Sequence, residues 1–317
     1  RSKWVFTPSA ATKLTLIGDY TNVSNSMNPQ RLAPGTVPNP GYGASAQPPY
    51  GYWDVVNDVS PKFTNRNWGA SLKLEHEFGA LNFMSLTAYR DSRTTLFWDV
   101  DFTEVPWLIG DLVDLESQFS EELQVSSKAG GKLNWTAGVY YFDAVGKYAP
   151  TGVTGNLFND VVFAGSPFEG IVKELQPYGT QPTESVAGYA QGTYALTDTT
   201  NLTLGTRYTT EDRKVKGRTD ILLTTSPTPI QLAPWSPWSK LSFNKWTWRA
   251  ALDHHFTPDV MGYASFNTGF KSGGFNTQST TDPSFLPETM NAYELGVKSD
   301  LFGRRLRLNV AAFYYDY

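Results

Sequence analysis

The chain has 317 residues, no cysteine, 30 acidic and 26 basic side chains, and a formal net charge of −4. The absence of cysteine excludes disulfides, thiolate metal sites and a cysteine nucleophile. The negative net charge argues against a nucleic-acid partner. Aromatic residues make up 15% of the sequence and charged residues only 18%. This composition fits a β-rich soluble protein, or an outer-membrane β-barrel whose strands hide their apolar residues in alternation.

Alternation of apolar and polar residues runs along most of the chain and predicts β-strands with one apolar face each. The first expected hairpins lie within residues 1–25 and 62–96. Further along, Leu133, Trp135 and Ala137 alternate with Asn134 and Thr136. The pattern returns at residues 202–211, 263–271, 293–298 and 306–314. No run of 18 or more apolar residues exists, which excludes a membrane-spanning helix.

The connections between these strands alternate strictly between short and long. Short connections are expected at Pro8–Thr12, Phe78–Ala80, Ala129–Gly131, Thr197–Thr200, Thr257–Asp259 and Leu301–Arg304. Long connections, rich in Pro, Gly, Asn and aromatic residues, are expected near residues 26–61, 97–114, 148–182, 217–240 and 271–287. The pattern gives about twelve strands, most of them with room for ten or more residues.

This segregation of connection lengths predicts an all-β fold, a transmembrane antiparallel β-barrel. Such a barrel has tight turns at the periplasmic rim, long loops outside, and strands of about 9–11 membrane-embedded residues. A soluble sandwich has shorter strands, of about 5–6 residues, and no reason to segregate its loops by length. A propeller would show a repeat of about 40–50 residues, and the sequence contains none.

Strand parity further predicts that the chain is an interior portion of a larger barrel. The first strand has about seven residues before the turn at Pro8, fewer than a bilayer requires. Both ends of the chain would lie on the extracellular side, whereas a complete bacterial barrel has its ends in the periplasm. Tyr317 resembles the aromatic residue that closes many such barrels, but it falls at the opposite rim.

Several segments also resemble the barrel domain of TonB-dependent outer-membrane receptors, most closely those of alphaproteobacteria such as sphingomonads. They are SEELQVSSKAGGKLNWTAGVYYF, YAQGTYALTDTTNLTLGTRYTTEDRK, WTWRAALDHHFTPDVMGYASFNTGFKSGGFN and ETMNAYELGVKSDLFGRRLRLNVAAFYYDY, which cover most of residues 115–317. The resemblance implies a barrel of about 22 strands around an N-terminal plug. It also implies uptake of a scarce nutrient, usually a ferric siderophore, with energy from the inner-membrane TonB complex. Residues 1–317 would then be part of one such barrel domain, with the plug and further strands outside this chain.

The stretch GFKSGG is the strongest candidate for phosphate chemistry, but its order of residues is wrong. A phosphate-binding loop needs Lys after the second glycine and a helix behind it, whereas Lys271 precedes Gly273 and Gly274 and no helical pattern follows. The strand interpretation instead places Phe266 toward lipid and Asn267 toward the lumen. The glycine pair would mark the passage from strand to loop.

Two further patterns contain residue types that can bind metal ions, but neither predicts a metal site. His254 and His255 are neighbours on an expected strand, so their side chains point to opposite faces and cannot share one ion. The loop between Trp98 and Glu116 carries six acidic residues and no basic one. It could bind Ca²⁺ or attract a cationic ligand, but a solvated acidic loop is the favoured interpretation. No metal, cofactor or catalytic residue is therefore expected.

Aromatic residues near strand ends are typical of the interfacial girdles of a barrel. They are Trp68, Trp98, Trp107, Trp135, Trp246, Trp248, Tyr293 and Tyr314. Loop aromatics could instead stack on an incoming ligand; they are Tyr42, Tyr50, Tyr52, Trp53, Trp235 and Trp238. Ligand contacts are expected at the loops and the mouth of the lumen, at Trp98, Asp99, Asp101, Lys271 and Phe275.

The sequence thus predicts a non-enzymatic receptor and transporter in the outer membrane of a Gram-negative bacterium. Its expected partners are TonB through the plug, outer-membrane lipid, and a small nutrient such as a ferric siderophore. Haem, cobalamin, a saccharide or another metal chelate is also compatible with the residues. The alternatives are a passive porin-like channel and a secreted carbohydrate-binding β-protein, the latter suggested by the loop aromatics.

Overall fold

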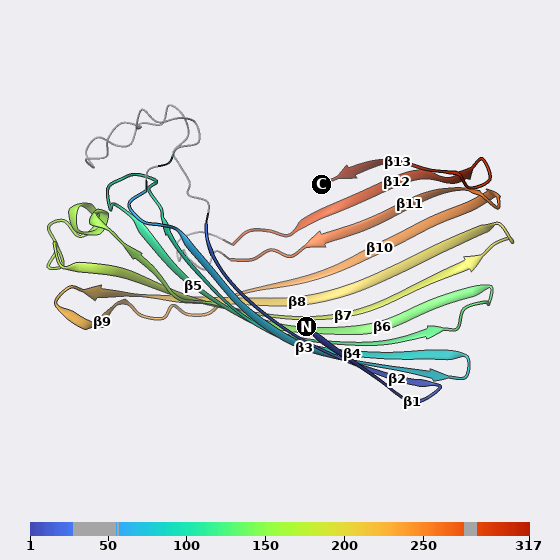
Figure 1. Cartoon of the computed structure of the whole chain (residues 1–317), viewed down its shortest axis with the longest axis horizontal. Helices are drawn as coiled ribbons and strands as arrows, with labels where there is room; N and C mark the ends of the chain where they lie inside the picture. The colour runs from blue at the N-terminus through green and yellow to red at the C-terminus, as the bar shows by residue number, and fades with distance from the viewer. Residues whose placement is uncertain (28–54, 56, 276–283) are drawn as a thin grey trace.

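The structure is a computed structural model that describes residues 1–27, 55, 57–275 and 284–317. One continuous antiparallel sheet dominates these residues (Figure 1). Its first strands are β1 Ser2–Ser9, β2 Thr12–Ser26, β3 Lys62–Phe78, β4 Leu81–Asp99, β5 Ile109–Ser127 and β6 Leu133–Thr154. The remaining strands are β7 Val172–Ala195, β8 Thr200–Leu223, β9 Ser226–Ala233, β10 Ser239–Thr257, β11 Val260–Lys271, β12 Glu288–Leu301 and β13 Leu306–Asp316. A five-residue π-helix, η2, covers Phe158–Val162.

The sheet order follows the chain from β1 to β13, except that β9 pairs only with β8. The predicted antiparallel fold is therefore confirmed, with 13 strands rather than twelve among the described residues. The additional strand β9 lies inside the expected connection 217–240. Among the described residues no helix is long and apolar enough to cross a membrane.

The short turns lie where the sequence predicts them, whereas the long connections β4–β5, β6–β7 and β8–β10 are shorter than expected. Strands β6, β7 and β8 have 22, 24 and 24 residues, about twice what a tilted strand needs to cross a bilayer. A strand segment beyond the bilayer can be hydrated on both faces, so it needs no apolar alternation and its sequence resembles a loop.

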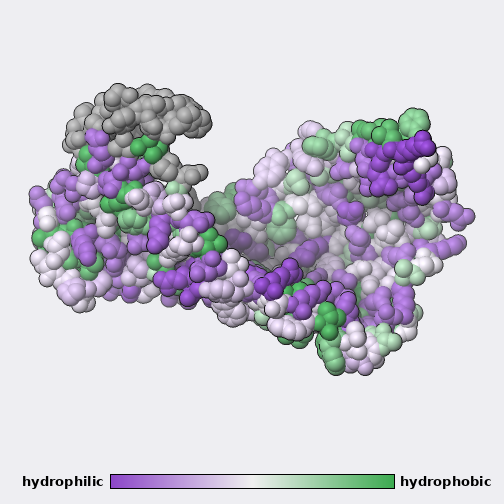
Figure 2. Space-filling model, viewed as in Figure 1, coloured by the Kyte–Doolittle hydropathy of each residue, from purple (hydrophilic) through white to green (hydrophobic). Residues whose placement is uncertain are grey.

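The two faces of the sheet differ in chemistry, as the alternation predicts. We call one the polar face, which carries Asp19, Arg90, Glu122, Tyr189 and Arg207, and the other the apolar face. Figure 2 shows one hollowed side of the molecule, on which hydrophilic residues predominate.

The apolar face carries a row of aromatic rings that contact one another across strands. The ring centroids of Tyr208 and Trp246 lie 4.8 Å apart. Those of Phe266 and Tyr293 lie 5.1 Å apart. Phe266 pairs in register with Ala250 and Tyr293, whereas Asn267 pairs with Arg249 and Ala292. The two residues thus lie on opposite faces, as expected from the sequence.

Long side chains on the polar face lie across glycines of the neighbouring strand. A Cβ atom at Gly69 would lie 2.9 Å from the Arg90 guanidinium, and one at Gly138 would lie 2.6 Å from the Tyr189 hydroxyl. Each glycine is the direct register partner of that side chain. Glycine at these positions lets Arg90 reach Asp19, with N–O distances of 2.9 and 3.0 Å.

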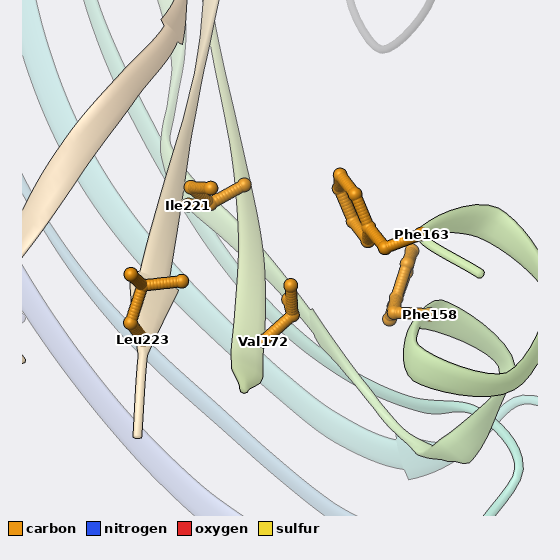
Figure 3. Packing of buried hydrophobic residues seen from close by; sticks show 5 residues of the cluster. All are labelled: Phe158, Phe163, Val172, Ile221 and Leu223. Carbon is orange, nitrogen blue, oxygen red and sulfur yellow. The ribbon is translucent and has the colours of Figure 1, made fainter. Parts of the chain in front are cut away.

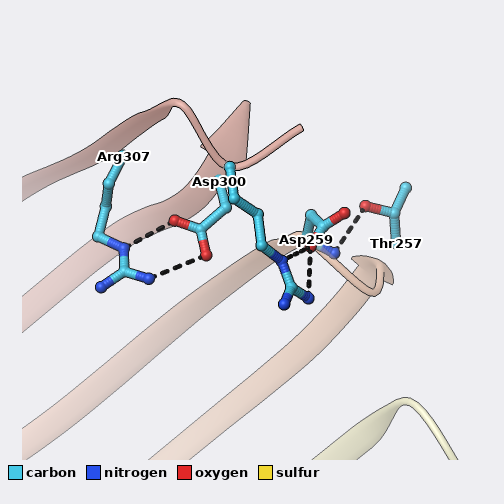
Figure 4. A network of polar contacts seen from close by, with 5 residues as sticks. Thr257, Asp259, Asp300 and Arg307 are labelled. Carbon is cyan, nitrogen blue, oxygen red and sulfur yellow. Dashed lines mark hydrogen bonds and ion pairs between the residues drawn. The ribbon is translucent and has the colours of Figure 1, made fainter. Parts of the chain in front are cut away.

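Two ion pairs lie at the short-turn rim, one within the β12–β13 hairpin and one between this hairpin and the β10–β11 turn (Figure 4). Arg307 donates two hydrogen bonds to Asp300, at 2.7 and 3.1 Å, and Arg304 lies 3.0 Å from Asp259. Both arginine side chains are mostly exposed. We therefore expect each pair to contribute about 1 kcal/mol or less to stability.

The hydrophobic core lies at the opposite end of the strands, where the connection 155–171 folds back on the sheet. Phe158 and Phe163 of this connection pack against Val172, Ile221 and Leu223 (Figure 3). In the register, Ile221 and Leu223 belong to the polar face. The packed connection therefore covers the polar face at its long-connection end.

Candidate ligand-binding site

The connection between β4 and β5 begins with three of the residues expected to contact a ligand. Trp98 pairs in register with Gly110, and a Cβ atom at Gly110 would lie 2.7 Å from the Trp98 ring. The ring therefore lies flat against β5 on the polar face. Asp99, the next residue, is almost completely buried.

Both aspartates of this connection accept hydrogen bonds that hold the backbone in a tight turn. Asp99 accepts from the backbone N–H groups of Asp101 and Phe102, at 3.0 and 2.7 Å. Asp101 accepts from the N–H groups of Thr103 and Leu108, at 3.0 and 2.7 Å. These carboxylates fix the shape of the loop, so Asp99 is not the solvated acid that the sequence suggests.

A third carboxylate, Asp58, lies beside this pair. Burial raises the pKa of Asp58, and the charges of Asp99 and Asp101 raise it further. Its Oδ1 atom is buried and has no hydrogen-bond partner among the described residues. The three aspartates therefore concentrate negative charge at one point of the mouth.

The connections β4–β5 and β6–β7 contact each other through their backbones. Asn156 donates to the Pro106 carbonyl at 3.0 Å, and Leu157 donates to the Trp107 carbonyl at 3.3 Å. Trp107 itself is buried in this contact region. The two connections thus form one packed unit above the polar face.

The segment after β11 extends across the polar face instead of outward. Ser272, Gly273 and Gly274 are buried, and Gly274 forms an isolated bridge with Phe285. A Cβ atom at Gly273 would lie 2.3 Å from the Phe285 carbonyl oxygen and 3.0 Å from the Phe243 ring. Close approach of the backbone thus accounts for the glycine pair.

Phe275 carries this segment to strands β5, β6 and β7, where it lines a cavity of about 410 Å³. The polar-face residues lining the cavity are Asp114, Glu116, Gln118, Tyr148, Gln181 and Thr183. The register partner of Asp114 on β4 is Thr94, and Trp98 lies four residues further along the same strand. The structure thus places Phe275 and Trp98 on one face at the same end of the sheet.

Lys271 lies apart from these residues. Its side chain is 71% exposed, and its Nζ lies 3.7 Å from Glu288 on β12. It is not among the residues that line the cavity under Phe275. The five residues expected from the sequence therefore divide into a mouth group and a separate ion pair; ligand contact at each of them stays a prediction.

The interpretation of strand-end aromatics as a girdle is wrong for two tryptophans. Trp98 lies on the polar face and Trp107 is buried between connections. Both stand in a connection that folds inward, which alternation alone does not reveal.

Among the loop aromatics, Trp235 and Trp238 flank the Lys216 ammonium group. Their ring centroids lie 4.9 and 4.6 Å from its Nζ. Since a cation already occupies these ring faces, the structure gives both tryptophans an intramolecular role. The other loop aromatics, Tyr42, Tyr50, Tyr52 and Trp53, lie outside the described residues.

The histidine pair behaves as its position on a strand requires. A hydrogen bond of 2.8 Å joins His254 Nδ1 to the Thr200 hydroxyl, and the His254 ring packs edge-on against Phe256. His255, the next residue, belongs to the opposite face. Within the described ranges, no three acidic or histidine side chains are placed to hold one metal ion.

Below the mouth, the polar face is a wall of hydrogen-bonded charges. The Tyr189 hydroxyl donates to Glu122 at 2.6 Å, and the Arg207 guanidinium lies 5.5 Å from the Tyr140 ring centroid. These side chains form hydrogen bonds and cation–π contacts with one another across neighbouring strands. Such a wall can contact a hydrated solute or a polar protein surface.

The sequence analysis assigned Asp114 and Glu116 to an acidic loop, whereas both lie on strand β5 and line the cavity under Phe275. Asp114 and Glu116 carry a signal, since they are acidic residues spaced two apart and therefore share one face of a strand. Tyr148 and Gln181 carry none, because they stand in segments that resemble loops. Only the register of β5, β6 and β7 brings these residues together.

Comparison with known proteins gives one family and a consistent fold. The family model described as TonB dependent receptor-like, beta-barrel matches residues 5–317. Among solved structures, the ferric yersiniabactin uptake receptor FyuA of Yersinia pestis has a TM-score of 0.72 at 15% identity over 96% of this chain. The siderophore receptor PiuA of Acinetobacter baumannii gives 0.68 at 16% identity over 98%. The open form of the ferric-catecholate import receptor Fiu of E. coli K12 gives 0.66 at 15% identity over 98%.

This chain spans less than two thirds of each of these structures. It covers 42% of the FyuA chain, 48% of the PiuA chain and 50% of the Fiu chain. At such low identity, the likeness concerns the fold alone. The resemblance to alphaproteobacterial sequences stays a prediction.

Proposed function

Because the chain belongs to the TonB-dependent receptor β-barrel family, we propose that it forms part of the wall of an outer-membrane receptor that takes up a scarce nutrient. The family consists of receptors and transporters, so the proposed activity has no catalytic step. The host would be a Gram-negative bacterium. Residues 1–317 would be one portion of the barrel domain, with a plug and further strands in the complete protein.

The observation that carries this proposal is the division of the sheet into two chemically different faces. An outer-membrane barrel needs apolar residues toward lipid and polar residues toward the lumen. The exposed aromatic rings of Trp246 and Trp248 on the apolar face suit contact with outer-membrane lipid. The hydrogen-bonded wall around Tyr189 and Arg207 suits a lumen occupied by a plug and water.

The long strands support a receptor rather than a simple channel. Segments of β6, β7 and β8 extend about ten residues or more beyond the length needed to cross the bilayer. Two packed connections and the segment ending at Phe275 then cover the polar face. A ligand arriving from outside would contact Trp98 and Phe275 before it reached the lumen wall.

A ferric siderophore or similar iron complex is the proposed cargo. Support comes from the fold it shares with FyuA, PiuA and Fiu, each described as a receptor for an iron complex or siderophore. In the proposed mechanism, the mouth residues capture the complex and the plug closes the lumen at rest. TonB, acting on the plug from the inner membrane, supplies the energy that opens the path.

Growth on defined iron sources tests this proposal and its alternatives. A strain that lacks its other iron receptors and produces the full-length protein should grow on some ferric siderophores, and only when TonB is functional. Growth that persists without TonB would support the porin-like channel. Release of the protein in soluble, detergent-free form with affinity for saccharides would support the secreted carbohydrate-binding protein.

A further inference from the structure

The cavity under Phe275 has the chemistry of an ammonium-binding site. Resting on the proposed function, the geometry points to a cargo that carries a protonated amine, which this cavity binds. The volume, about 410 Å³, lies in the usual range for small-ligand sites. It would accommodate one arm of an iron complex rather than the whole of it.

Two carboxylates supply the charge that an ammonium group requires. Asp114 and Glu116 lie two residues apart on β5, so both side chains point to the polar face and toward the cavity. No ion pair joins either carboxylate to a basic side chain within the ranges that the structure covers. A ligand ammonium group could therefore pair with them without displacing a protein cation.

The uncharged part of the lining adds further hydrogen-bond acceptors. Gln118, Thr183 and Tyr148 each present an oxygen on this part of the wall. Gln181 also lines the cavity, from β7. An ammonium group, with three donors and no acceptor, matches a wall that offers acceptors in excess.

Nearby cations do not neutralise this site. Lys147 touches the cavity, but Leu115 is its register partner, so its side chain belongs to the apolar face. Arg213 lies beneath Gly274, where its Nε is 2.6 Å from Glu211. The negative charge of Asp114 and Glu116 therefore remains available to a ligand.

Phe275 completes the lining; it follows β11 and therefore comes from a different part of the sheet than β5–β7. An aromatic ring stabilises a cation bound at its negative face, and Phe275 is among the residues that line the cavity. The buried glycines before Phe275 allow the segment to pass close over Phe243 and Arg213, which brings the ring to β5–β7. Carboxylates and ring thus come from segments about 160 residues apart, held together by the fold.

Matched iron complexes test the inference in the purified full-length protein. The probes are the ferric complexes that support growth, each compared with its own N-acetylated form when it carries a free primary amine. We expect the free amine to bind on the order of tenfold more tightly than the acetylated form. The readout is the ratio of the two dissociation constants.

Charge-neutralising substitutions assign the effect to the cavity. Asp114→Asn and Glu116→Gln should each bring the ratio toward one and leave the affinity for the acetylated complex unchanged. Asp111→Asn is the matched control, since it removes an acid from the same strand but outside the cavity lining. Unchanged binding of the acetylated complex shows that the variants fold.

Three results would overturn the inference: growth-supporting complexes without an amine, equal binding of both forms, or an equal effect of the control substitution. Each leaves the proposed function standing, because uptake of an iron complex would still be observed. If no ferric complex supports growth through the protein, the proposed function fails as well. The two failures are thus distinguishable.

Discussion

The packing of the connection 155–171 on the sheet depends on Phe158, so Phe158→Ala should release it. Phe158 is 6% exposed and belongs to a cluster that includes Ile221, which is fully buried. Truncation of a buried phenylalanine costs about 3–5 kcal/mol, part of it from the cavity left behind. At the lower limit of about 3 kcal/mol, opening of the connection would become roughly a hundredfold more frequent.

Hydrogen–deuterium exchange of backbone amides measures this opening. The informative amides are those of Phe163, which donates to the Phe158 carbonyl at 2.7 Å, and Thr224, which donates to the Ile171 carbonyl at 2.9 Å. Both should exchange roughly a hundredfold faster in Phe158→Ala, whereas amides of β12 should keep their wild-type rates.

Val161→Ala provides the matched control for this substitution. Val161 belongs to the same π-helix, but its side chain is 48% exposed. We expect a change of about 0.5 kcal/mol or less, as is usual for exposed positions. Equal exchange rates in the two variants would refute the account of how this connection is held.

Three further predictions concern charge, sidedness and backbone packing. Folding raises the pKa of Asp58, so the folded mouth binds more protons than the unfolded chain, and the stability of the mouth falls as pH rises through the raised pKa. Asp58→Asn should therefore slow hydrogen exchange of the adjacent amides at pH 7 and have no effect on it in acid, below the ordinary carboxyl pKa. This chain has no cysteine, so Leu295→Cys in the outer membrane should not react with a membrane-impermeant maleimide, whereas Glu294→Cys, on the opposite face, should react once the plug is removed. The reverse pattern would show that the faces are misassigned. Gly273→Ala should lower the stability of the fold by about 1–3 kcal/mol through overpacking and speed amide exchange at the neighbouring bridge between Gly274 and Phe285. Gly269→Ala should be tolerated, because a Cβ atom there would meet only a methionine methyl group at 3.8 Å; equal tolerance of both variants would contradict the close approach at Gly273.

The sequence predicted the parts of the fold in which a local pattern determines the outcome. Alternation within one strand is sufficient to place Phe266 and Asn267 on opposite faces. The short turns follow from their own residues in the same way. Both features depend on neighbours in the chain, which is why periodicity reveals them.

What the sequence did not reveal depends on partners distant in the chain. Tyr189 lies across Gly138, and Arg90 across Gly69, only because the register of two strands places them opposite. The cavity under Phe275 likewise requires β11 and β5–β7 together. Strand segments beyond the bilayer also lose their alternation, so the mouth is the least predictable part of this fold.

Accumulation of radiolabelled iron is the most direct test of the central claim, that this chain forms the wall of an energised receptor. Cells that produce the full-length protein as their only iron receptor would be given a growth-supporting ferric complex, with TonB either functional or deleted. We expect accumulation against a concentration gradient that is lost when TonB is deleted, while binding to the cell surface remains. Equal accumulation in both strains would contradict it.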